Sequence, residues 1–144
     1  MDTRLERFVQ AQDAGGTYEQ ALAEIDRGRK VSHWMWFVFP QVAGLGRSEM
    51  ARRYALGGLD EARAYLADPV LGPRLARAAR AVLDSGAPDA TSLMGGIDAV
   101  KLCSSMTLFE EAASGTHGGA WAVFGEVLDR YYAGRRDPAT LARL

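Results

Sequence analysis

The residues with the most chemical potential gather in one short window of the chain, Ser32–Gln41. This window holds two of the three Trp, two of the five Phe and one of the two His. His33 and Trp36 offer flat surfaces on which a base or a nicotinamide could stack. Lys30 lies just before the window and could meet a phosphate or a carboxylate, while Gln41 adds a donor and an acceptor. The window therefore predicts a binding site for a flat, anionic molecule.

The same window also fits a purely structural role. An apolar run of this kind is more often packed inside a protein, and this interpretation is favoured for Trp34, Met35 and Val38. A binding role stays open for His33 and Trp36. If segment 33–41 is exposed instead, it would form a surface for a protein partner, and the chain would be an interaction module.

A second group of polar residues follows at 98–107. On a helix, Lys101 shares one face with Asp98, Ser104 and Ser105, because these lie three or four residues away from it. A Lys beside a Ser can serve as general base for a serine nucleophile, but the order here reverses the Ser-x-x-Lys signature. An ion pair between Asp98 and Lys101 is favoured, with Asp98 able to polarise water or a ribose hydroxyl.

These two windows, with one residue of the first helix, predict a single pocket. The residues expected to carry chemistry are Asp98, Lys101 and His33. The residues expected to bind the ligand are Gln12, Lys30, Trp36 and Gln41. Two His and the single Cys103 have no metal-ligand spacing, so the sequence predicts no metal and no cofactor.

Two weaker patterns favour ordinary structural roles. Segment Gly44–Gly46 could bring backbone N–H groups close to a phosphate, but neither a Gly-Lys-Ser/Thr continuation nor a preceding strand accompanies it. A flexible turn is the favoured interpretation. Arg74, Arg77 and Arg80 recur at helical spacing and are expected to form a solvated face.

Composition limits the class of protein and of partner. The 144 residues fit one domain over 1–144, and 17 Lys and Arg nearly balance 18 Asp and Glu. A net charge of −1 argues against binding duplex nucleic acid through its phosphates. The longest apolar run, 34–40, is too short to cross a bilayer, and the charged start is no signal peptide. We expect a cytoplasmic protein, since a lone Cys fits a reducing compartment.

The pattern of apolar residues is helical almost throughout. Neither sustained alternation nor an Asn-Gly or Asp-Gly hairpin turn occurs, and the connections are short and rich in Gly. Asp68 and Pro69 predict a helix start, after which Gly72-Pro73 would kink or restart the helix. The prediction is an all-α, compact single domain of about seven or eight short helices.

Several segments of the chain closely resemble a bacterial family, the domain-of-unknown-function family 1810. They are Arg7–Gln12, Gly28–Lys30, Ser32–Gln41, Gly44–Gly46, Tyr65–Leu66, Pro69–Leu75, Asp98, Lys101–Leu102 and Met106–Phe109. The resemblance runs from near Leu5 to the C-terminus. It implies a compact, mainly helical domain and carries no established activity.

A shorter resemblance concerns the patch Gln10-Ala11-Gln12. It is similar to a Gln-Ala-Gln patch of the NADAR superfamily, a helical group linked to ADP-ribose and nucleotide N-glycosidic chemistry. This resemblance implies a nucleotide-like, ADP-ribosyl ligand. The sequence thus predicts a small cytosolic domain that binds or processes such a molecule, with the interaction module as the alternative.

Overall fold

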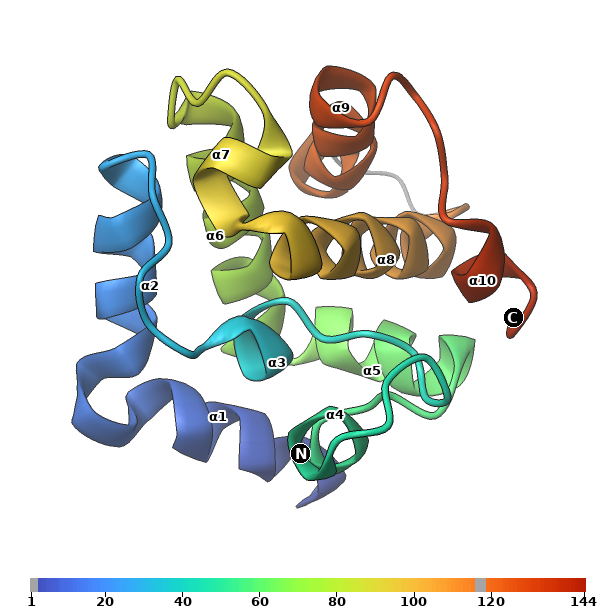
Figure 1. Cartoon of the computed structure of the whole chain (residues 1–144). Helices are drawn as coiled ribbons and strands as arrows, with labels where there is room; N and C mark the ends of the chain where they lie inside the picture. Colours follow the sequence, from blue (N-terminus) through green and yellow to red (C-terminus); the bar gives the residue numbers. More distant parts are fainter. Residues whose placement is uncertain (1–2, 116–118) are drawn as a thin grey trace.

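Helices make up nearly all the regular structure of the computed structural model, which describes residues 3–115 and 119–144 (Figure 1). The sequence places His117 in a glycine-rich loop, and this residue lies outside the described ranges. The α-helices in chain order are α1 (Glu6–Asp13), α2 (Thr17–Asp26), α3 (Met35–Val38), α4 (Glu49–Arg53), α5 (Leu59–Ala67), α6 (Leu71–Asp84), α7 (Ala90–Met94), α8 (Gly96–Ala113), α9 (Ala122–Tyr131) and α10 (Pro138–Leu141). The 3-10 turns are Thr3–Leu5, Ala14–Gly16 and Gly119–Trp121.

The all-α prediction is confirmed. In the described ranges the sole strand-like pairing is an isolated parallel bridge between Val42 and Leu56. The chain is divided more finely than the apolar pattern suggested, because α3, α4, α7 and α10 have only four or five residues each. Such single turns are too short to show a helical period in sequence.

Helix α8 is the central element of the fold and crosses the middle of the molecule in Figure 1. It packs against α5, α7, α9 and α10. Its second half is buried nearly all round, and Leu102, Met106 and Phe109, which share one face at helical spacing, are fully buried. Its first two turns differ, since Ile97 and Val100 are exposed there. The N-terminal half of α8 therefore presents large apolar side chains at the surface.

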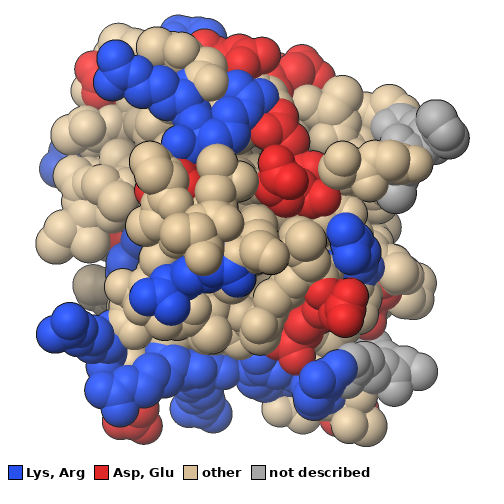
Figure 2. Space-filling model, turned by 90° about the vertical axis from the view of Figure 1, so that its right-hand side faces the viewer, with Lys and Arg blue, Asp and Glu red and all other residues tan. Residues whose placement is uncertain are grey.

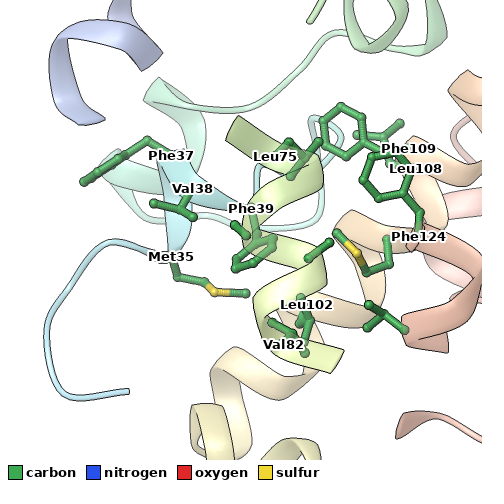
Figure 3. Packing of buried hydrophobic residues seen from close by; sticks show 14 of the residues in the cluster. Met35, Phe37, Val38, Phe39, Leu75, Val82, Leu102, Leu108, Phe109 and Phe124 are labelled. Atoms are coloured by element: carbon green, nitrogen blue, oxygen red, sulfur yellow. The ribbon is translucent and has the colours of Figure 1, made fainter. Parts of the chain in front are cut away.

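The aromatic segment is mainly core. Trp34 and Phe39 are fully buried, and Met35 and Val38 nearly so. Figure 3 shows Met35 and Phe39 beside apolar residues of α6 and α8 such as Leu102, whereas Phe37 points away from them. The structural interpretation of Trp34, Met35 and Val38 is therefore confirmed. The interaction-module alternative needs an exposed aromatic surface, and Trp34, Phe37 and Phe39 do not supply one, because they pack in the core.

The start of α6 corrects the sequence prediction. Asp68 does cap it, since its Oδ1 accepts the N–H groups of Val70 (2.9 Å) and Leu71 (3.0 Å). The helix itself begins at Leu71, two residues later than expected. Gly72 and Pro73 then lie in the first turn, where a Pro is tolerated because its missing N–H would be unpaired anyway. They neither kink nor restart the helix.

The absence of a side chain at Gly72 is a packing requirement. A Cβ atom there would collide with the backbone carbonyl of Leu66 and crowd the indole of Trp121. We expect Gly72→Ala to lower the free energy of unfolding by about 2 kcal/mol, the usual size of an overpacking effect. Urea unfolding measures this. Gly57→Ala is the control, because a Cβ at Gly57 meets nothing within 4 Å, and equal stability of the two variants would contradict the account.

Candidate functional site

Three charged side chains meet where the segment before α3 reaches the start of α8. Lys30 Nζ lies 2.8 Å from Asp98 Oδ2, and Lys101 Nζ lies 3.7 Å from Asp98 Oδ1. The side chains of Lys30, Asp98 and Lys101 are 7%, 20% and 23% exposed. The predicted pair of Asp98 and Lys101 is present, and Lys30 is a second and closer cation. The group combines two ammonium ions with one carboxylate in a partly desolvated position, where its excess positive charge is poorly screened.

Each ammonium group also lies over an indole ring. Lys30 Nζ is 5.0 Å from the ring centroid of Trp34, and Lys101 Nζ is 4.9 Å from that of Trp36. The two rings differ in their polar contacts. Trp34 donates its indole N–H to Glu24, whereas the buried Nε1 of Trp36 has no hydrogen-bond partner among the described residues. An unpaired buried donor is uncommon in folded proteins, so Trp36 Nε1 is the group here that lacks an acceptor.

A first cavity of about 340 Å³ opens beside these groups. The predicted site residues that line it are Lys30, His33, Trp36 and Asp98. His33 is exposed and Trp36 is half-buried. Residues 94–97, at the junction of α7 and α8, complete the lining, and no side chain caps the start of α8. The partial positive charge of this helix start adds to that of the two lysines.

A second cavity of about 420 Å³ lies further along α8. It contains the other two predicted site residues, Gln41 and Lys101. Ile97 lines both cavities, and Lys101 in the second pairs with Asp98 in the first. Leu45 and Gly46 of the glycine-rich turn also line the second cavity, so this turn borders the site. Six of the seven predicted residues thus lie in two neighbouring cavities.

The seventh predicted residue, Gln12, is placed elsewhere and lines neither cavity. It is buried, and its Nε2 donates to the carbonyl of Phe37 (2.8 Å) and to the hydroxyl of Tyr65 (3.3 Å). Its Oε1 accepts from Arg74 (3.1 Å). Because its amide is used in tying α1 to α3, α5 and α6, the structure does not bring Gln12 to the other candidates.

Arg74 does not belong to the solvated face that the sequence predicted. Besides holding Gln12, its guanidinium lies 2.8 Å from a carboxylate oxygen of Asp13. Arg77 and Arg80 remain exposed and make surface pairs at 3.9 and 3.3 Å with acidic residues. The predicted helical spacing is correct. Arg74, at one end of the row, nevertheless contacts α1 rather than solvent alone.

Glu24 is a residue of this region that the sequence analysis missed. It is buried, and its Oε1 accepts from the N–H groups of Val31 (2.7 Å), Ser32 (2.9 Å) and the indole of Trp34 (2.9 Å). Burial raises the pKa of this carboxyl, but hydrogen bonds from Ser32, Val31 and Trp34 outweigh burial and lower the pKa to about 2. The anion fixes the segment that carries Lys30. The available signal was an acidic residue on the buried face of α2, between Leu22 and Ile25.

Ser104 has structural contacts, whereas Ser105 Oγ has no hydrogen-bond partner among the described residues. Ser104 donates to Asp137 Oδ2 (2.8 Å), and the same oxygen accepts the hydroxyl of Thr140 (2.5 Å) at the start of α10. Ser105 is fully buried. Cys103 is half-buried, and burial together with the charge of Asp137 raises the pKa of its thiol. These contacts favour the ion-pair interpretation of the 98–107 window over serine catalysis.

The surface charge is unevenly distributed. In Figure 2, Lys and Arg side chains follow the lower edge of the molecule, at the height of α4 in Figure 1, whereas both signs mix near the top. The last turn of α4 contributes Arg52 and Arg53, both exposed. The protein therefore combines a net charge near zero with a locally cationic edge. The absence of binding to duplex nucleic acid stays a prediction.

Two further properties follow from the described ranges. Across residues 3–115 and 119–144, no three or more His, Cys, Asp or Glu side chains gather in a way that could hold a metal ion. Across the same residues, every helix is either too short or too polar to traverse a bilayer.

Comparison with known proteins identifies the family. No curated protein matches the chain. The chain is similar to the conserved hypothetical protein Rv1873 from Mycobacterium tuberculosis, whose crystal structure has a TM-score of 0.89 and 44% identity to it, with 97% of this chain and 95% of that chain covered. These matches do not support the likeness to the NADAR superfamily. The family model described as protein of unknown function (DUF1810) matches residues 2–144, and the chain therefore belongs to the DUF1810 family.

Proposed function

We propose that the chain binds a nucleotide-like small molecule, with an anionic group and a flat ring, in the first cavity. The observation that carries this proposal is the group Lys30, Asp98 and Lys101 beside the half-buried ring of Trp36. Two ammonium ions and one carboxylate leave an excess of positive charge, which the uncapped start of α8 reinforces. An anionic group such as a phosphate complements this charge.

The flat part of the ligand is supported by the lining of the same cavity. Trp36 lines it with Met35 and Met94, and thioether and indole groups pack well on a planar ring. Trp36 Nε1 is buried and has no partner among the described residues, so the ring face of Trp36 is the part offered to the ligand. His33, exposed at the cavity edge, offers a further donor or stacking surface.

The geometry favours binding over chemistry for Asp98. Its two carboxylate oxygens face two ammonium groups, which suits holding a ribose hydroxyl in place. Catalytic roles for Asp98, Lys101 and His33 stay predictions, as does an ADP-ribosyl ligand. Because the rings of Trp34, Phe37 and Phe39 are buried, segment 33–41 offers little aromatic surface for the interaction module as a second function.

The test is a titration with AMP, NAD and ADP-ribose, followed by thermal shift and calorimetry. We expect at least one of the three to stabilise the wild-type protein. Lys30→Met should lower the affinity for that nucleotide by about tenfold or more, since a charge-assisted hydrogen bond is lost. The matched control is Arg29→Met, which removes the same charge from an exposed neighbour and should change the affinity less than about twofold.

Lys101→Met keeps this test informative if Lys30→Met is poorly folded, because Lys101 is the more exposed of the two lysines. No stabilisation by any of the three nucleotides at millimolar concentration would contradict the proposal. So would equal losses of affinity in Lys30→Met and Arg29→Met.

A further inference from the structure

The second cavity has a different character from the first. Apolar side chains from three separate segments line it, namely Leu45 before α4, Ile97 and Val100 on α8, and Ala139 on α10. Ile97 is 77% exposed and Val100 is 64% exposed. They lie three residues apart and therefore on one face of α8. Large apolar side chains this exposed lose water only when something covers them.

The polar groups of the second cavity are largely occupied. Ser104 donates to Asp137, and Asp137 also caps α10. The main-chain carbonyl of Gln41 accepts from Leu56 (3.0 Å). The carboxylate of Asp137 would repel a second anionic group. The cavity therefore suits an uncharged apolar or aromatic group.

The two cavities lie next to each other, which suits one ligand. Ile97 belongs to both linings, and the Asp98–Lys101 pair joins the first to the second. A ligand whose anionic group contacts Lys30 and Lys101 would have to extend past Ile97 to contact Val100. A substituent on the far side of that anionic group would thus enter the second cavity.

We infer that the second cavity is a subsite for an apolar or aromatic group esterified to the anionic group of the ligand. The ligand class is then a phosphodiester, with a nucleoside on one side of the phosphate and an aryl or alkyl group on the other. This inference rests on the proposed function for the position of the phosphate.

The experiment compares AMP, its methyl ester and its phenyl ester, in which a benzene ring is attached to the phosphate. We expect the phenyl ester to bind the wild-type protein about tenfold more tightly than the methyl ester of AMP, which carries the same single phosphate charge, because partial burial of one ring in an apolar cavity is worth about a decade of affinity. Val100→Asn should remove this gain and leave AMP affinity unchanged. Val31→Asn is the matched control, since Val31 is 72% exposed and lines neither cavity. It should keep the full gain.

The outcomes separate the two proposals. If AMP binds and the phenyl ester binds no more tightly than the methyl ester, the subsite is wrong and the proposed function stands. The same holds if Val100→Asn and Val31→Asn behave alike. If the phenyl ester binds with a gain that Val100→Asn removes but Lys30→Met changes nothing, the subsite stands and the phosphate position is wrong. If none of the three compounds binds at millimolar concentration, both proposals are overturned.

Discussion

Trp34→Ala is expected to lower the free energy of unfolding by about 4 kcal/mol, the usual effect of removing a fully buried aromatic side chain. Trp34 is completely buried, packs 6.2 Å from the ring of Phe39 and donates its indole N–H to Glu24. Its loss leaves a cavity and removes one of the three hydrogen bonds that Glu24 Oε1 accepts.

The matched substitution, Trp36→Ala, should affect nucleotide binding far more than stability. Trp36 is half-buried and its Nε1 makes no hydrogen bond among the described residues, so Trp36→Ala should cost about 1 kcal/mol of stability. It should nevertheless weaken nucleotide binding by about tenfold or more, as the loss of a stacking surface does. Urea unfolding followed by far-UV circular dichroism and calorimetric titration measure the two effects. Equal losses of stability, or unchanged binding by Trp36→Ala, would contradict this division of roles.

The second large effect is acid sensitivity caused by Glu24. Its pKa is lowered from 4.5 to about 2 in the folded protein, so the unfolded chain takes up the proton at higher pH. The stability that Glu24 contributes is therefore fully present above pH 4.5 and is lost as the pH falls towards 2. The shift corresponds to roughly 3 kcal/mol at neutral pH.

Glu24→Gln isolates this contribution. The variant should be less stable at pH 7 by a similar amount and should lose less stability than the wild-type protein between pH 5 and pH 2. Glu19→Gln, an exposed change on the same helix, should follow the wild-type curve. Unfolding by urea at a series of pH values gives the three curves. Parallel curves for wild type and Glu24→Gln would show that Glu24 is not the group responsible.

The sequence predicted the helices well because their stability comes from apolar faces of helical period. Leu102, Met106 and Phe109 are one example, and all three are fully buried. The predicted pair of Asp98 and Lys101 is local to one helix turn and was equally accessible to pattern reasoning.

Contacts between distant segments could not be predicted in this way. Lys30 meets Asp98 only because its backbone N–H bonds to the carbonyl of Leu93 (2.7 Å), which places it at the α7–α8 junction. Gln12 and Glu24 were misjudged or missed for a related reason. Both lie on the buried faces of their helices, where a polar side chain must find partners inside the protein, and those partners come from other elements.

The most direct test of the account follows the indole N–H signals of the tryptophans by ¹⁵N-resolved NMR during titration with AMP, NAD and ADP-ribose, with assignments from Trp→Phe variants. The account predicts that the Trp36 signal shifts with saturation, since Trp36 lines the first cavity, while that of Trp34, bonded to Glu24 at 2.9 Å, stays in place. A Trp36 signal unmoved at millimolar concentrations of all three nucleotides would contradict it.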